Sequence, residues 1–231
     1  MKLLALDTSS EGCSAALSLD GRVTERFELA PRGHTRLLMP MIRELLAAES
    51  MAPAALDALA FACGPGSFTG LRIATGVVQG LAYGLERPVV PVSSLAAVAA
   101  EAIMRYELAE GAGVAVAFDA RMGEVYWGCY RNVGGLPELL ADERVCPPDA
   151  VTLPDSVTGW LGAGSGWAFS EQMPPEVVSR VTTVDDGLVP RAAFVARLAV
   201  RDYARGRSVP AAEAQPVYLR DEVAWKKLPG R

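Results

Sequence analysis

Residues 2–29, KLLALDTSSEGCSAALSLDGRVTERFEL, alternate apolar runs with turn signals. The runs are residues 2–7, 13–19 and 23–29, and Asp20-Gly21 separates the last two. Asp-Gly between two strand-like runs favours a tight hairpin, because both turn positions need positive φ. The stretch therefore predicts consecutive strands at the start of the chain.

The pattern then changes to helices that alternate with strands. After residue 33, apolar residues recur at the spacing of an amphipathic helix, in a stripe formed by Leu37, Leu38, Met41, Ile42, Leu45 and Leu46. A strand is predicted at residues 56–63, a helix at 71–85 and a strand at 89–92. Another helix opens at Ser93 or Ser94, which are good N-cap residues. This order is typical of an actin-like, ribonuclease-H-like α/β lobe with a mixed sheet flanked by helices.

The first strand-turn-strand unit recurs about half-way along the chain. Ala5-Leu6-Asp7 precedes a polar turn and a strand, and Ala117-Phe118-Asp119 precedes a turn and a predicted strand at 125–130. Each unit ends in a hairpin signal, Asp20-Gly21 in the first and Gly134-Gly135 in the second. The repeat predicts two related lobes, residues 1–108 and residues 109–231, with a ligand cleft between them.

The second lobe is less regular, because prolines are frequent and helical stripes are short between residues 136 and 190. Strands are predicted near residues 139–145 and 181–184, and a helix at 191–205. The lobe boundary depends only on the Gly111-Ala112-Gly113 turn.

Composition limits the class of protein. Of the 231 residues, 51% are hydrophobic, which suffices for a full core, and a net charge of −5 gives no general attraction to polyanions. Asp7 interrupts the apolar start where a signal peptide would continue. The apolar segment 73–85 is shorter than the roughly 20 residues that span a bilayer. We expect a cytoplasmic protein without a membrane span, which meets RNA only with a partner's help.

Cysteine and histidine offer little chemistry. Cys13, Cys63, Cys129 and Cys146 are scattered without a Cys-x-x-Cys pair, which favours buried free thiols. His34 is the only histidine, so a metal site or a Ser-His-Asp triad would have to be built around it alone.

Asp7 and Asp119 occupy matching places at the ends of two strands. In actin-like ATPases such turns face each other across the cleft and bind phosphates, so the pair, with Thr8 and Ser9, is a candidate for a vestigial nucleotide cleft. The alternative is that each aspartate only starts a turn. Gly162-Ala163-Gly164-Ser165-Gly166 is a weak candidate for the adenosine side.

The most specific string is the loop Gly64, Pro65, Gly66, Ser67, Phe68, Thr69 and Gly70, followed by Leu71 and Arg72. It leaves a strand and enters a helix, which Ser67 or Thr69 could cap. It could bind an anion, but it lacks the lysine of a phosphate-binding P-loop. Positioning of the helix is the more economical interpretation.

Two helices carry unusual stripes. Gly76, Gly80 and Gly84 lie on one face, although glycine inside a helix costs about 1 kcal/mol relative to alanine. Close approach of another backbone would explain them, either from the chain's own sheet or from a second protein. Late in the chain, Arg197, Arg201 and Arg205 also recur every four residues. They form either a solvated basic face or a phosphate-contacting patch that meets tRNA.

Several strings together resemble the bacterial TsaB (YeaZ) family of tRNA threonylcarbamoyladenosine biosynthesis. In chain order these are residues 1–8, His34-Thr35, residues 64–72, residues 119–126 (DARMGEVY), residues 216–220 (PVYLR) and residues 226–229 (KKLP). The resemblance covers nearly the whole chain and is least specific over residues 136–190. It implies an actin-like, two-lobed fold.

The resemblance further implies a non-catalytic scaffold. TsaB-type proteins pair with the catalytic subunit TsaD and work with the ATPase TsaE, and the complex modifies the adenosine beside the anticodon of tRNAs that read codons beginning with A. TsaD-type relatives carry a His-x-x-x-His metal pair where this chain has Ser94 and Val98, which cannot replace imidazole ligands. We therefore expect no metal, no cofactor and no catalysis, and tRNA contact only through the complex. A nucleotide at the interface with a partner stays open.

The partner surface is expected on two helices and comprises Leu37, Leu38, Met41, Leu45, Arg72, Gly76, Gly80 and Gly84. Two such helices can meet the equivalent pair of a related subunit as a four-helix bundle. Without that subunit the chain is expected to cover the surface as a homodimer.

Two rival functions belong to other classes. One is a phosphotransferase or ATPase that uses Asp7 and Asp119. The other is a glycoprotease-like peptidase, for which Ser67 has no evident triad because His34 is the single imidazole.

Overall fold

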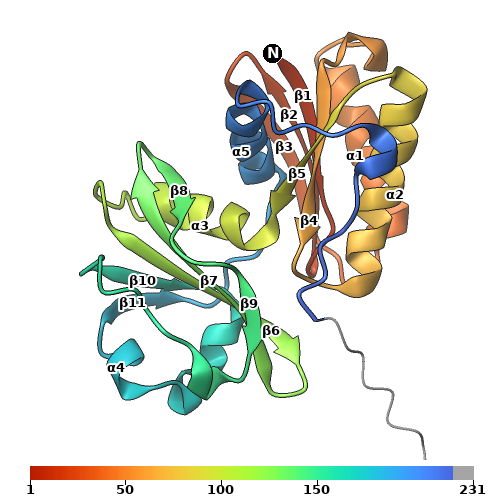
Figure 1. Ribbon diagram of the computed structural model, residues 1–231. Coiled ribbons are helices and arrows are strands. Elements are labelled where there is room, and N and C mark those ends of the chain that lie inside the picture. Colours follow the sequence, from red (N-terminus) through yellow and green to blue (C-terminus); the bar gives the residue numbers. More distant parts are fainter. Residues whose placement is uncertain (221–231) are drawn as a thin grey trace, which may run out of the picture.

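The computed structural model describes residues 1–220 and forms two lobes, each built on a mixed sheet (Figure 1). The first sheet has the order β3-β2-β1-β4-β5. Its strands are β1 (Lys2–Asp7), β2 (Gly12–Leu19), β3 (Arg22–Leu29), β4 (Ala58–Gly64) and β5 (Val89–Ser93). β1 pairs antiparallel with β2 and parallel with β4, which in turn pairs parallel with β5.

The second sheet repeats this topology with the order β11-β10-β6-β7-β8. Its strands are β6 (Gly113–Arg121), β7 (Glu124–Val133), β8 (Leu136–Leu139), β10 (Trp160–Ala163) and β11 (Val181–Asp185), and β9 (Arg144–Cys146) also pairs with β7. β6 pairs antiparallel with β7 and parallel with β10, as β1 does with β2 and β4. The predicted repeat and the actin-like, ribonuclease-H-like fold are therefore confirmed.

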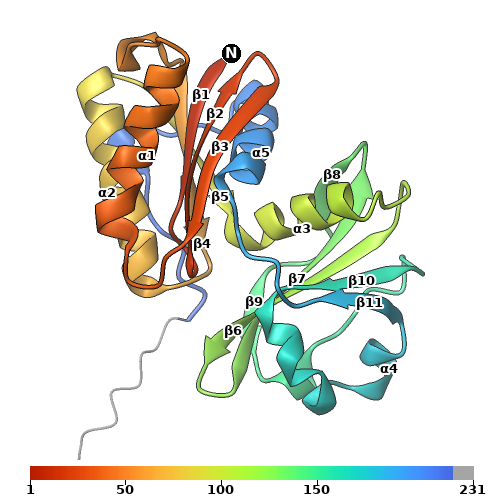
Figure 2. The ribbon, with the colours of Figure 1, turned by 180° about the vertical axis from the view of Figure 1, so that it is seen from behind.

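Helices cover both faces of the first sheet (Figures 1 and 2). α1 (His34–Ala48) and α2 (Phe68–Leu85) pack on the outer face, while α3 (Ser94–Arg105) and α5 (Ala192–Ala204) pack on the face toward the second lobe. α3 lies between the two sheets and is buried along most of its length. The shorter helices are α4 (Pro175–Val178), η1 (Pro53–Ala55), η2 (Pro148–Ala150), η3 (Ser165–Gln172) and η4 (Ala211–Glu213).

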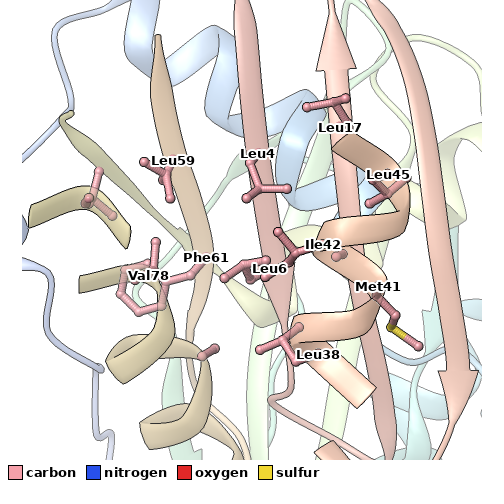
Figure 3. Packing of buried hydrophobic residues seen from close by; sticks show 14 of the residues in the cluster. Leu4, Leu6, Leu17, Leu38, Met41, Ile42, Leu45, Leu59, Phe61 and Val78 are labelled. Carbon is pink, nitrogen blue, oxygen red and sulfur yellow. The ribbon is translucent and has the colours of Figure 1, made fainter. Parts of the chain in front are cut away.

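The outer core of the first lobe follows from period-2 strands facing a helical stripe. Leu4, Leu6 and Leu17 point from the sheet toward Leu38 and Leu45 of α1 (Figure 3). Both α1 leucines are 1% exposed, so truncating either to alanine should cost about 2–5 kcal/mol. The alternate residues of the same strands face α5, because successive side chains of a strand point to opposite sides.

The predicted division of the chain at residues 108 and 109 is wrong for the C-terminal part. α5 packs against the first sheet, and the amide of Ala192 donates to Ser14 Oγ at 2.9 Å. Val209 then pairs with Val89 on the edge of the same sheet. The first lobe is thus formed from two separate stretches of chain, because the apolar face of α5 finds its matching surface on β1 and β2.

Local predictions hold with small shifts. Asp20 and Gly21 both have positive φ, as do Gly134 and Gly135, so both predicted hairpins are confirmed. Ser67 caps α2 and Ser93 caps α3, each accepting from a backbone amide. The predicted strand at 139–145 is instead two strands, β8 and β9, which pair with different parts of β7. Among the described helices, none has the length and apolar character needed to cross a membrane.

Candidate functional site

The turn after β1 is held by the side chain of Asp7, the last residue of that strand. The amide and hydroxyl of Ser9 both donate to Asp7 Oδ1, at 3.0 and 2.6 Å. Asp7 is fully buried, and its other carboxylate oxygen, Oδ2, has no hydrogen-bond partner. Burial, with a smaller contribution from Glu25, raises the pKa of Asp7 to about 7 despite the bonds from Ser9 that lower it.

The glycine loop closes over this turn. Ser67 N donates to Ser9 O at 2.7 Å, and Thr8 Oγ1 donates to Gly70 O at 2.7 Å. A Cβ at Gly66 or Gly70 would lie well under 3.0 Å from the backbone oxygens of Ser9 and Thr8. These glycines are therefore required by the close approach of two backbone segments.

The same contacts use the amides that an anion would need. Ser67 N and Ser9 N are bonded within the turn and loop, and Gly70 N donates to the capping Ser67 Oγ at 3.3 Å. This geometry favours the interpretation that the loop positions α2. The arrangement does not offer these three donors to a phosphate.

The second turn has different surroundings. The side chain of Asp119 is 28% exposed, accepts from Arg121 N at 2.7 Å and pairs with the Arg121 guanidinium at 3.1 Å. Ser165 Oγ accepts from Asp119 N at 3.2 Å. Asp7 and Asp119 thus take equivalent topological places, but one is sealed and the other lies at an accessible turn.

The glycine-rich stretch after β10 is explained by packing. A Cβ on Gly162 would lie 2.6 Å from the Trp167 ring, and one on Gly164 would lie 2.6 Å from Ala117 O. Trp167 Nε1 donates to Ala115 O at 2.9 Å, which fixes the ring against the sheet. The weak sequence signal for an adenosine site therefore has a structural explanation.

The helix face that carries Gly76, Gly80 and Gly84 points outward. A Cβ at any of these three positions would meet no atom within 4 Å. The alternative that the glycines allow contact with the chain's own sheet is wrong. Arg72 lies on the same exposed side at the start of α2, where its guanidinium carbon is 3.6 Å from the centre of the Phe68 ring.

The α1 stripe does not share this exposure. Leu38, Met41 and Leu45 are buried in the core of the first lobe, and Leu37 packs partly against it. The prediction that Leu38, Met41 and Leu45 bind a partner is wrong, because an amphipathic helix on a sheet turns its apolar stripe inward. Leu37 is partly exposed, and its role at a partner surface stays a prediction. The candidate surface thus loses these three side chains and keeps the outer side of α2.

The arginine row on α5 is not uniform. Arg201 is engaged within the chain, donating to Asp202 at 2.9 Å and to Pro137 O at 3.1 Å. Arg197 and Arg205 are exposed. The fold therefore does not present three equivalent arginines as a row that could contact tRNA. The lysines at 226 and 227 lie outside the described residues.

The remaining candidate groups have structural partners. All four cysteines are free and buried, and burial raises the pKa of Cys63 and of Cys129 to about 12. His34 Nε2 lies 2.9 Å from Ser10 O, and within residues 1–220 it makes no hydrogen bond to Ser67. No group of three His, Cys, Asp or Glu side chains within that range could hold a metal ion.

Sequence reasoning missed one exposed cluster. Tyr218 lies 5.4 Å from Phe68, centre to centre, and its hydroxyl accepts from Arg72 Nε at 3.1 Å. The string PVYLR was noticed only as part of a resemblance, and nothing local in it indicates a contact with α2.

Comparisons with known proteins agree with this geometry. A protein named tRNA threonylcarbamoyladenosine biosynthesis protein TsaB from Haemophilus influenzae is 40% identical over all of this chain and 98% of its own length. The Escherichia coli protein of that name is also 40% identical, over the full length of both. The chain belongs to the TsaB family.

The wider relationships are consistent with this membership. Residues 27–160 of this TsaB-family chain match the family model described as TsaD: tRNA N6-adenosine threonylcarbamoyltransferase. The solved structure of YeaZ from Pseudomonas aeruginosa is 48% identical, with a TM-score of 0.88 over 94% of this chain and 99% of that one. A second Pseudomonas aeruginosa structure, described as similar to peptidase YEAZ, has the same TM-score at 47% identity.

Proposed function

We propose that this TsaB-family chain is a non-catalytic scaffold subunit in the formation of tRNA threonylcarbamoyladenosine, and that it acts by binding a TsaD-type catalytic subunit through the outer face of α2. In this proposal the free protein pairs with itself through the same face. The observation that carries the proposal is the exposed row of Gly76, Gly80 and Gly84.

The glycine row is costly unless something packs on it. Each glycine in a helix interior costs about 1 kcal/mol relative to alanine, and α2 is an 18-residue helix with three of them on one side. The chain's own packing does not need them, since each faces open space. A partner backbone that approaches closely would gain extensive van der Waals contact there. A TsaD-type subunit is the favoured partner because this chain matches the TsaD family model over residues 27–160.

The polar groups of the candidate cleft support the proposal that the chain is non-catalytic, because they are buried or bonded within the chain. Asp7 is sealed, and loop amides that could hold phosphates bond to the chain itself. Ser94 and Val98, where TsaD-type relatives are expected to carry their metal pair, are both buried on α3. This arrangement offers no specific observation in favour of a phosphotransferase or of a peptidase.

Recruitment of a TsaE-type ATPase and contact with tRNA belong to the same proposal and are expected only in the complex. Arg197 and Arg205 are exposed and could add phosphate contacts there. At a net charge of −5, the chain alone should bind tRNA weakly.

The proposal is tested with Gly80→Leu. The leucine has room in the isolated chain, so the variant should fold, but it should hold a partner helix away from α2. We expect at least about a hundredfold loss of affinity for the TsaD-type subunit, and loss of self-association by sedimentation. Threonylcarbamoylation of tRNA, assayed with TsaD- and TsaE-type proteins and the adenylate donor, should fall with it.

The matched control is Gly159→Leu in the second lobe. Gly159 is also exposed, has no neighbouring atom within 4 Å of a built Cβ, and has no positive φ. It should leave affinity, self-association and tRNA modification unchanged. If folded Gly80→Leu binds the TsaD-type subunit as tightly as Gly159→Leu does, the partner surface lies elsewhere.

A further inference from the structure

The last described segment of the chain, residues 206–220, connects the two lobes. We call this segment the strap. It leaves α5, pairs with β5 through Val209, and follows α2 downward toward the second lobe (Figure 1). Gln79 of α2 donates to Ala214 O at 2.8 Å, and Val217 N donates to Cys63 O at 2.7 Å. The strap is thus attached to the first lobe at β5, at α2 and at the end of β4.

The strap contributes to the surface beside the glycine face. Tyr218 is 39% exposed, stacks against Phe68, and accepts from Arg72 Nε. Val217 is 46% exposed. A protein that packs on the outer side of α2 near Arg72 would therefore also meet the strap.

The strap ends on the hairpin that joins β6 to β7. The side chain of Arg220 is only 19% exposed, and its guanidinium pairs with the Glu124 carboxylate. The same guanidinium lies 3.4 Å from Arg121 O and 3.6 Å from Met122 Sδ. One side chain thus contacts three of the four residues at the hairpin tip.

The hairpin tip has positive φ at three successive residues. Arg121, Met122 and Gly123 all have positive φ, of 65°, 58° and 76°. Positive φ at the loop residues is the usual geometry of a tight hairpin turn, and within the tip the Asp119 carboxylate accepts from Arg121 N at 2.7 Å. Arg121 and Met122 are not glycines, so a further contact can stabilise this conformation. The Met122 side chain is 74% exposed, so it supplies little packing of its own. Arg220 adds a contact from the first-lobe side that can stabilise this conformation.

We propose that the strap couples the outer face of α2 to the conformation of the β6–β7 hairpin. Contact at Tyr218 keeps the strap on α2, the strap places Arg220, and Arg220 holds Arg121 and Met122 in their left-handed conformations. A subunit that binds the α2 face holds the strap in place and so stabilises the hairpin. This second part rests on the proposed function, whereas the coupling within the chain does not.

The intramolecular coupling is tested by hydrogen exchange of the full isolated chain, followed in peptides that cover residues 119–126. Arg220→Ala should speed exchange at the tip by about tenfold, because the open state becomes more populated. Tyr218→Ala, remote from the hairpin, should speed it as well, though less. The control is Gln215→Ala, an exposed strap residue whose side-chain amide donates to Ala212 O within the strap, and it should change nothing. Normal tip exchange in folded Tyr218→Ala would overturn the proposal.

The coupling to a partner is tested by adding the TsaD-type subunit. Wild-type chain should show slower tip exchange in the complex, while Arg220→Ala should bind with unchanged affinity and show no slowing. If the subunit binds and the wild-type tip exchanges as in the free chain, the coupling is wrong and the proposed function stands. If the subunit does not bind at all, the proposed function fails, and the Tyr218→Ala result still decides the coupling within the chain.

Discussion

The two strand-turn-strand units have the same topology and opposite exposure. In the first lobe, the turn after β1 is covered by the glycine loop, and Asp7 is buried with one oxygen unpartnered. In the second lobe, the turn after β6 protrudes, and Asp119 forms an ion pair with an arginine that is 81% exposed. The comparison teaches that a repeated local pattern does not carry a repeated chemistry, because packing around it differs.

The largest expected effect tests whether the first turn is sealed. Gly70→Ala would place a methyl group against Thr8 O, in backbone that cannot move aside cheaply, and should lower the free energy of unfolding by about 3 kcal/mol or more. Gly123→Ala, in the second hairpin, has open space and only the cost of positive φ, about 1 kcal/mol. Urea unfolding measures both. Equal losses would show that the two turns are equally open.

The next prediction concerns the charge inside the sealed turn. Burial raises the pKa of Asp7 to about 7 from 3.8, so the folded chain holds a proton that the unfolded chain releases. The stability from this proton is complete below about pH 4 and is lost as the pH rises to about 7. Asp7→Asn cannot titrate, and its stability relative to wild type should therefore rise by about 3 kcal/mol between pH 4 and pH 8.

Unfolding curves at several pH values measure this difference. Thr8→Val is the control, because it changes the same turn and keeps the carboxyl group, so it should retain the wild-type dependence on pH. A constant gap between Asp7→Asn and wild type across this range would contradict a buried, protonated Asp7.

The smallest expected losses of stability concern one hydroxyl group in each turn. Thr8 Oγ1 donates to Gly70 O in a buried site, so Thr8→Val should cost about 1 kcal/mol by removing that hydrogen bond. Ser165 Oγ accepts from Asp119 N at an exposed turn where water can replace it, and Ser165→Ala should cost about 0.5 kcal/mol or less. Thermal unfolding resolves the two, and a larger loss for Ser165→Ala would reverse the comparison.

Much of the fold could be predicted because its signals are local. Asp20-Gly21 marks a hairpin through the φ angles it permits, and Ser67 marks a helix start through the amide it caps. The repeat of a strand ending in aspartate also indicated two related lobes. Each of these signals acts within a few residues along the chain.

The candidate site was predictable only in part. Periodicity identifies both the α1 stripe and the α2 glycines. The apolar α1 stripe indicates a buried face, whereas a row of glycines does not indicate whether its face is covered. The α1 stripe is buried and the glycine face is open. Likewise, the sequence identifies Asp7 as a candidate, but the turn after it is covered by Gly66 and Gly70, which approach Ser9 and Thr8 from a distant part of the sequence.

By itself, the sequence determined the order of strands and helices in the first lobe, the hairpin turns, and membership of an actin-like class with a TsaB-like set of strings. Tertiary structure alone decided that α5 returns to the first sheet, that Asp7 is sealed, and that Arg220 reaches Arg121 and Glu124 on the second-lobe hairpin. The physical reason is the distance along the chain over which each kind of interaction acts. Backbone angles and caps depend on neighbouring residues, whereas burial and charge pairing depend on which distant surfaces fit together once the chain has folded.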